Sequence, residues 1–141
     1  MKKVVLIFGL SILFISFKIN NDSELLYEQA LLNHYSNHKT DKIYVLKCSD
    51  IELKSKVGKH TIVDISDNIK SYCGKDSSLY AIKLLPIESN KGNFEITIID
   101  YLIKIHAGEI TMSNAGSVIY RYKYEGSKNR YKMIKKIKYT F

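Results

Sequence analysis

Apolar residues near the start of the chain recur at the spacing of an α-helix. From about residue 23 to residues 35–37, apolar side chains cover more than half of the circumference that such a helix would have: Leu25, Leu26, Tyr27, Ala30, Leu31, Leu32 and Tyr35. Asp22 or Ser23 is suited to cap its N-terminus. A helix this apolar needs cover on most sides, so the pattern predicts one helix that lies against a curved sheet.

Short segments with the alternating pattern of β-strands follow. The alternation predicts short strands over residues 43–48, 51–57 and 60–66. The next segment carries the signals of a short helix, with Ser66 as the N-cap and Gly74 as the left-handed residue that ends it. From Leu79 onward the pattern is that of an antiparallel meander, whose first strand ends at or near Pro86.

The strand predicted over residues 94–105 changes its apolar face part of the way along. Phe94, Ile96 and Ile98 share one face. The other face carries the apolar residues that follow: Ile99, Tyr101, Ile103 and Ile105. An extra residue inserted as a β-bulge at residues 98–100 would return both halves to one side and bend the strand, so we expect a bulge there.

The last two strands are predicted to form a hairpin around residues 125–130. If its tyrosines share one face, Tyr124 pairs with Tyr131 and Tyr122 with Met133. Lys123 then faces Lys132 on the outer side, where like charges oppose each other. This register predicts an outer face that carries Arg121, Lys123, Arg130, Lys132, Lys136 and Lys138.

These elements predict an α+β fold in which an N-terminal helix packs against a strongly bent antiparallel β-sheet, like a cone. The element order over residues 23–141 resembles the cystatin-like and nuclear-transport-factor-two-like superfold, in particular small exported bacterial proteins of that plan. The Gln-x-Val-x-Gly loop of cystatins is absent, so the resemblance does not imply protease inhibition. Proteins with this fold include enzymes, binding domains and structural modules, so it implies no catalytic residues.

The first residues have the pattern of an export signal. Lys2 and Lys3 precede the uncharged, mostly apolar residues 4–17. A helix of that length would span about 21 Å, less than the ~30 Å of a hydrocarbon core. Because no Ala-x-Ala-like cleavage site follows, an uncleaved membrane tether and a buried helix stay open as alternatives. We therefore expect a signal peptide over residues 1–18, one domain over residues 19–141, and a secreted or periplasmic protein.

Export bears on the two cysteines, Cys48 and Cys73. In an oxidising compartment they could form a disulfide, which would stabilise the fold by about 3 kcal/mol. The alternative is two separate thiols that behave as small apolar residues. The spacing of the two cysteines in the sequence is compatible with both a disulfide and two separate thiols.

The net charge of +8 is concentrated at the C-terminal end. Residues 116–141 hold eight basic residues and a single acid, Glu125. Such a surface could bind an anionic polymer or another envelope protein, or it could be a solvated strand face that discourages edge pairing. Two arginines in the whole chain, and tyrosines on the buried side, disfavour nucleic acid. A membrane contact is expected only if the N-terminal segment stays uncleaved.

Side chains with catalytic or ligand chemistry are few. Asp64, Asp100 and His106 are candidate polar groups of a pocket at the open end of the cone. Asp100 and His106 lie about 20 Å apart along one strand, so they cannot form a dyad, and Asp100 is expected to bond the backbone of the bulge. His34 and His38 have the i, i+4 spacing of two metal ligands, but their place at a helix end favours capping or surface roles.

Motifs for cofactors are also missing. Gly58-Lys59 and Gly74-Lys75 lack the earlier glycine of a phosphate-binding loop. We therefore predict no catalytic residue, metal or cofactor, and a non-catalytic exported binding or interaction module of the bacterial cell envelope. The alternatives are a small enzyme or ligand carrier that uses the open end of the cone, and an electrostatic binder of anionic surfaces that uses the basic hairpin.

Overall fold

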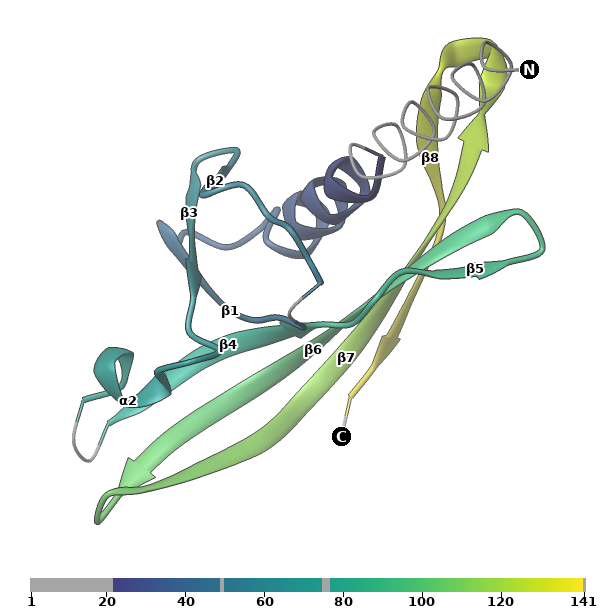
Figure 1. Ribbon diagram of the computed structural model, residues 1–141. Coiled ribbons are helices and arrows are strands. Elements are labelled where there is room, and N and C mark those ends of the chain that lie inside the picture. The colour runs from purple at the N-terminus through teal and green to yellow at the C-terminus, as the bar shows by residue number, and fades with distance from the viewer. Residues whose placement is uncertain (1–21, 49, 75–76, 141) are drawn as a thin grey trace, which may run out of the picture.

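The computed structural model of the protein describes residues 22–48, 50–74 and 77–140. Within them, eight strands form one open sheet with helical segments beside it, an α+β fold (Figure 1). The strands are β1 (Lys42–Leu46), β2 (Lys56–Val57), β3 (His60–Asp64), β4 (Ser78–Leu84), β5 (Glu88–Asn90), β6 (Asn93–His106), β7 (Glu109–Glu125) and β8 (Arg130–Tyr139). Residues 22–34 are helical, and two shorter helices follow, α2 (Ile69–Tyr72) and the 3-10 helix η1 (Gly126–Lys128).

The sheet is mixed, which corrects the expectation of a purely antiparallel one. Its strand order is β2-β3-β1-β4-β6-β7-β8, and β5 pairs with the remaining edge of β6. Strand β1 runs parallel to both β3 and β4, whereas the other pairs are antiparallel. Parallel neighbours need a crossover connection. Residues 47–59 and the segment that contains α2 supply these connections.

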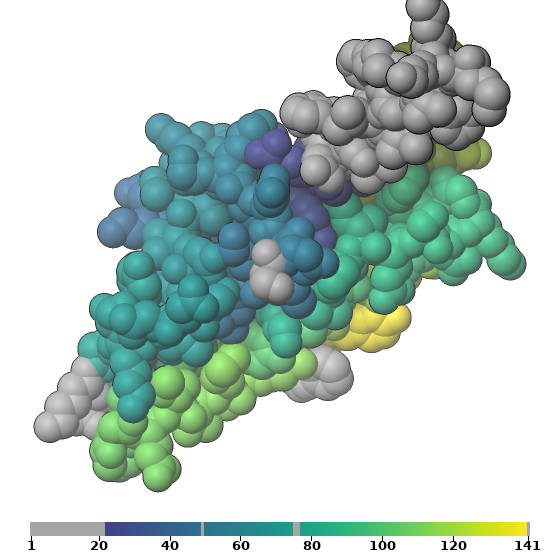
Figure 2. Space-filling model, in the orientation of Figure 1, coloured from purple at the N-terminus to yellow at the C-terminus, as the bar shows by residue number. Residues whose placement is uncertain are grey.

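The helix over residues 22–34 covers one face of the sheet. Its residues Leu26, Tyr27, Ala30 and Leu31 are buried in one cluster with side chains of several strands, among them Ile43, Ile82, Leu84, Ile96, Ile98, Val118, Tyr120 and Tyr122. The Tyr27 hydroxyl also donates a hydrogen bond to the Leu85 carbonyl oxygen at 3.1 Å. In the space-filling view, a few purple atoms of this helix are visible beside the blue-teal segments and above the green strands (Figure 2).

A second, smaller core lies on the opposite face. It contains Leu46, Ile65, Ala81 and Ile103, with Ile69 of α2 packed against it. Ala81 and Ile82 are neighbours on β4 and belong to different cores, because successive residues of a strand point to opposite faces.

These two cores explain the change of apolar face along β6, and they correct the predicted bulge in that strand. Ile96 and Ile98 belong to the first core, and Ile103 belongs to the second. Strand β6 pairs with β4 without a register shift from Leu84↔Ile98 to Ser78↔Lys104. The pattern therefore records a strand that is buried first on one face and then on the other.

A bulge does occur at this level of the sheet, but in the neighbouring strand β7. Asp100 pairs with Gly116 and Tyr101 with Asn114, which leaves Ala115 as the extra residue. Gly116 has a φ of 146°, in the region that favours glycine. Its N–H donates a hydrogen bond to Oδ1 of Asn114 at 2.8 Å. The bulge is thus held by its own side chain and by a glycine.

A second bulge lies in β8 and changes the predicted outer face of the hairpin. The predicted pairs Tyr124↔Tyr131, Tyr122↔Met133 and Lys123↔Lys132 are confirmed. Between Met133 and Lys135 the register shifts and leaves Ile134 as the extra residue. Beyond it, Lys136 pairs with Tyr120 and Lys138 with Val118. Lys136 and Lys138 therefore lie on the helix-covered face, and their predicted place on the outer face is wrong.

The short helix α2 is present, but its predicted caps are wrong. Asn68 is the N-cap, and Gly74 is not in the left-handed region. The Ser66 hydroxyl is occupied elsewhere, because it accepts a hydrogen bond from the Lys47 N–H at 2.9 Å and donates one to Oδ1 of Asp64 at 2.6 Å. Burial favours the neutral Asp64 carboxyl, but the bonds from Ser66 and Lys47 outweigh it and lower its pKa.

Both cysteines are free thiols in the structure. Cys48 packs against the first core, and Cys73 is buried, with its Sγ 3.5 Å from the Ser77 hydroxyl. The expected signal segment, residues 1–18, lies outside the described residues. In the part of the chain that the structure does describe, no helix has both the length and the apolar character needed to cross a bilayer.

Substitution of Gly116 by alanine should destabilise the fold more than the same change at Gly92. A Cβ at Gly116 would meet the Tyr139 carbonyl oxygen at 2.9 Å, whereas one at Gly92, which also has a positive φ, would meet nothing within 4 Å. Both variants carry the backbone cost of about 1–3 kcal/mol, and only Gly116→Ala adds a clash. We expect an extra loss of about 2 kcal/mol in the free energy of unfolding, measured by urea denaturation. Equal losses in the two variants would contradict the tight packing of the β7 bulge.

The stability should fall in alkali because of buried tyrosines. Burial raises the pKa of Tyr122 from the ordinary value of 10.0 to about 12. The folded state therefore favours the neutral phenol, so its contribution is complete below pH 10 and is lost as the pH rises to about 12. This group alone should lower the free energy of unfolding by about 2–3 kcal/mol over that interval. Urea denaturation at a series of pH values should show a shallower fall in Tyr122→Phe, and an unchanged slope would contradict the assignment.

Candidate functional site

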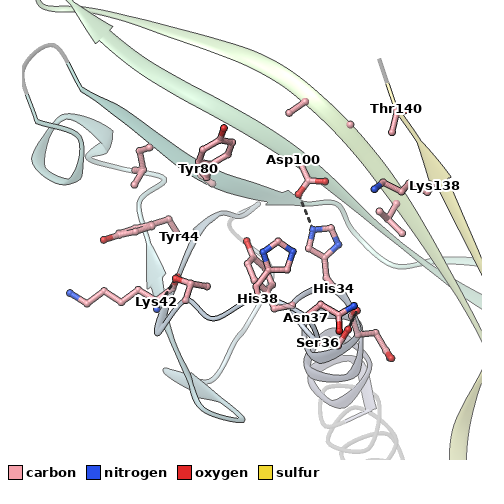
Figure 3. A pocket seen from close by; sticks show the side chains of 18 of the residues that line it. His34, Ser36, Asn37, His38, Lys42, Tyr44, Tyr80, Asp100, Lys138 and Thr140 are labelled. Carbon is pink, nitrogen blue, oxygen red and sulfur yellow. Dashed lines mark hydrogen bonds and ion pairs between the residues drawn. The ribbon is translucent and has the colours of Figure 1, made fainter.

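An open pocket of about 780 Å³ lies where the helix over residues 22–34 ends above the sheet (Figure 3). The segment that follows the helix forms one wall, and the sheet forms the other. The sheet contributes Asp100 from β6, Ala115 and Gly116 from the β7 bulge, and residues beyond the β8 bulge. Both register shifts thus border the pocket. Bulges often redirect side chains beside functional sites.

A chain of three side chains leads from the core to the pocket, which is lined by two of them, His34 and Asp100. His34, in the last turn of the helix, places Nε2 2.8 Å from Oδ1 of Asp100. Its other ring nitrogen, Nδ1, lies 3.1 Å from the Tyr120 hydroxyl. The His34 side chain is 9% exposed and that of Asp100 is 34% exposed, so the chain runs from the core to the pocket. Figure 3 shows Asp100 and His34 joined across the space between β6 and the helix.

The partners of His34 determine where its proton lies. An ionised carboxylate only accepts hydrogen bonds, so Nε2 carries the hydrogen and donates it to Asp100. Burial, together with the nearby Tyr122 and Asp100, raises the pKa of Tyr120, which keeps its phenol protonated. The Tyr120 hydroxyl can then donate to Nδ1. Both ring nitrogens of His34 thus have a hydrogen-bond partner.

Cationic side chains also line the pocket. Lys42, Lys136 and Lys138 line the pocket, the first from β1 and the others from β8. Nζ of Lys136 lies 5.4 Å from the centre of the Tyr120 ring, a cation–π contact. Among the described residues, none of the three lysines forms an ion pair. The formal charge of the lining is therefore positive even with Asp100 ionised.

Aromatic rings make the helix-side wall stiff. The Tyr35 ring centre lies 5.3 Å from that of His34, 5.1 Å from His38 and 5.8 Å from His60. His60 is buried, and its Nδ1 donates to the Thr40 carbonyl oxygen at 2.6 Å. Burial, with a smaller effect of Asp100, raises the pKa of Tyr35, so this ring is a neutral packing group. These contacts hold residues 35–40 against β3.

The rim of the pocket carries exposed aromatic surface. Tyr80 of β4 lines the pocket and is 71% exposed, which is unusual for a large aromatic side chain. Tyr44 of β1 lines the same side and stacks at a tilt on Tyr72, with ring centres 6.1 Å apart. Rings at the mouth of a pocket offer flat apolar surface to a ligand.

Of the predicted pocket groups, the structure places only Asp100 in the pocket. Its expected role at a bulge is wrong, because Asn114 bonds the bulge backbone and Asp100 bonds His34. Asp64 lies at the end of β3, with Lys47 and Ser66 as partners. His106 is at the far end of β6, in register with Glu109 beside the β6–β7 turn.

The two histidines predicted for one helix do not act together, because the helix ends at His34 and His38 lies beyond it. His34 points to Asp100, so its expected capping or surface role is wrong, and His38 contacts Tyr35 instead. Across the described residues, no group of three or more His, Cys, Asp or Glu side chains is arranged to hold a metal ion. The signal that could have linked His34 with Asp100 is weak, because 66 positions separate them in the sequence.

The six basic residues predicted for one surface are divided between two faces. Lys136 and Lys138 line the pocket, while the others belong to the outer face or the turn. On that side, Arg121 forms an ion pair with Glu95 at 2.6 Å. Arg130 and Lys132 approach Glu125 at 3.2 Å and 3.9 Å. Three of the outer cations are thus close to a carboxylate, whereas the described lysines of the pocket are not.

Comparisons with known proteins identify no relative of this chain. A scan against protein-family models found no matching family, and searches of curated proteins and of solved structures found no match either.

Substitution of Tyr120 by phenylalanine tests the chain of hydrogen bonds. It removes the donor to Nδ1 of His34 and leaves a buried acceptor unpaired, so the free energy of unfolding should fall by about 1–2 kcal/mol. Tyr122→Phe is the matched control, because its hydroxyl accepts only a 3.4 Å bond from Asn33. Urea denaturation at neutral pH should show the smaller loss in Tyr122→Phe. The reverse order would contradict the proposed network.

Proposed function

We propose that the protein is a ligand-binding module that takes a small organic anion into the pocket at the end of its helix. The observation that carries this proposal is the β8 bulge, which turns Lys136 and Lys138 from the outer face to the pocket face. Without the extra residue Ile134, the alternation of the strand would direct both lysines to the outer face. Lys42 of β1 also lines the pocket, and its side chain extends away from Asp100 (Figure 3).

The charges of these lysines are available to a ligand. Among the described residues, none of them forms an ion pair with an acid. The Lys136 ammonium group lies over the ring of Tyr120. An ammonium group without an anionic partner at the edge of a low-dielectric wall attracts anions more strongly than one in open water. The apolar and aromatic parts of the lining, such as Val118 and Tyr80, favour an organic anion over a small inorganic ion.

Binding rather than catalysis is the activity that the contacts support. Both ring nitrogens of His34 are engaged, one by Asp100 and one by Tyr120. A general base needs a free acceptor within hydrogen-bond reach of its substrate. With both nitrogens engaged, His34 offers none, and its contact with Asp100 instead orients that carboxylate toward the pocket.

We also propose that the module works outside the cytoplasm and shares the cone-like plan of the cystatin-like and nuclear-transport-factor-two-like superfold. The export pattern of residues 1–18 supports the first point. The second is supported by the packing of residues 22–34 across β4, β6 and β7 and by the bulges in β7 and β8. The parallel strand β1 is a departure from a purely antiparallel cone.

Neutralisation of the pocket lysines should weaken anion binding selectively. In isothermal titration with benzoate and with hexanoate, Lys136→Gln and Lys138→Gln should each raise the Kd by about tenfold, since a charge-assisted contact is worth roughly 1.5–3 kcal/mol. Lys123→Gln and Lys132→Gln are matched controls, because they remove the same charge from the outer face of the same hairpin. Equal weakening by all four variants, or no binding of either anion to the unaltered protein, would overturn the proposal.

A further inference from the structure

Asp100 is an unexpected residue in a pocket that binds anions. Among the described residues that line the pocket, it is the one acid. Its carboxylate would repel any ligand that carried only negative charge, and the pocket would bind such a ligand better without it. Its presence beside three lysines therefore needs a reason other than anion binding.

The geometry of Asp100 leaves one carboxylate oxygen for a ligand. Oδ1 is held 2.8 Å from Nε2 of His34. Within the described part of the chain, Oδ2 has no hydrogen-bond or ion-pair partner, and the side chain is 34% exposed. A carboxylate has several acceptor sites, and an unused one at a partly buried position favours a hydrogen-bond donor. His34 fixes the orientation of the group.

Asp100 does not serve to neutralise the pocket lysines. Among the described residues, no lysine forms an ion pair with it, and its ion-pair partner is His34. By the strand register, Lys138 lies two strands from Asp100 and is offset from it by two residues along the strands, about 12 Å in the plane of the sheet. The lysines and the carboxylate can thus contact different ends of one molecule.

An aromatic side chain lies on the side of Asp100 that is opposite to Lys138. Tyr80 is one strand away on β4, on the same face of the sheet as Ile82, which pairs with Asp100. Figure 3 shows Asp100 between Tyr80 and Lys138. The order across the face is therefore an aromatic ring, an anion and a cation.

We infer that the ligand of this pocket is bifunctional: it carries an acid group that the pocket lysines bind and an ammonium or hydroxyl group that donates to Asp100. This inference rests on the proposed function and adds the ligand class. Asp100 then acts as the specificity group, because its repulsion weakens the binding of plain anions and its carboxylate favours those that bring a donor. The required separation between the two groups is on the order of 5 Å, since a lysine side chain covers part of the distance between the strands.

Two aromatic acids that differ in a single donor group test the inference. Benzoate carries the acid alone, and para-(aminomethyl)benzoate adds an ammonium group on the far side of the ring. By isothermal titration the second probe should bind the unaltered protein at least about tenfold more tightly than benzoate. In Asp100→Asn, which keeps an oxygen for His34 but loses the charge, this preference should shrink to about twofold or less.

The lysine variants separate this inference from the proposed function. Lys138→Gln should weaken both probes, whereas Lys132→Gln on the outer face should weaken neither. If benzoate binds as tightly as its aminomethyl derivative and Lys138→Gln weakens both, the inference is overturned and the proposed function stands. If neither probe binds, or Lys132→Gln weakens them as much as Lys138→Gln does, the proposed function itself fails. Thermal unfolding of Asp100→Asn shows whether the variant is folded, and Asp100→Ser serves as a second variant if it is not.

Discussion

The burial of the helix over residues 22–34 against one face of β4, β6 and β7 is the constraint on which the rest of the structure depends. Leu26, Ala30 and Leu31 are almost fully removed from solvent in this contact. Burial of such side chains stabilises a fold by roughly 1.5–3 kcal/mol each for the larger ones. The helix also determines where the site lies, because its last turn places His34 over Asp100.

Two β-bulges interrupt the regular pairing of the sheet on the side where the helix packs. The bulge at Ala115 changes the register of β7 beside Asp100, and the bulge at Ile134 changes the register of β8. Each interrupts a regular ladder, and each lies next to the pocket. A regular sheet would place a different set of side chains beneath the end of the helix. The bulges therefore connect the packing of the core with the composition of the pocket.

The pocket combines groups with opposite preferences. The lysines attract negative charge, while Asp100, held by His34, attracts a donor. Tyr120 links the two, because its hydroxyl contacts His34 and its ring contacts Lys136. The outer face of the same hairpin has cations whose charge is partly met by Glu95 and Glu125. This difference in pairing distinguishes a solvated strand face from a surface suited to bind.

The pattern of apolar residues determined the α+β class, the meander from β4 onward and the pairing of Tyr124 with Tyr131, because periodicity and turn residues act over short stretches of chain. It also indicated that the apolar face of β6 changes near Asp100. It did not indicate that the second face of this strand is buried by Leu46 and Ile65. The parallel pairing of β1, the pocket faces of Lys136 and Lys138, and the contact of His34 with Asp100 were decided by the tertiary structure. A single inserted residue in a strand reverses every side chain after it, and a hydrogen bond across 66 positions exists only once the helix and the sheet have packed.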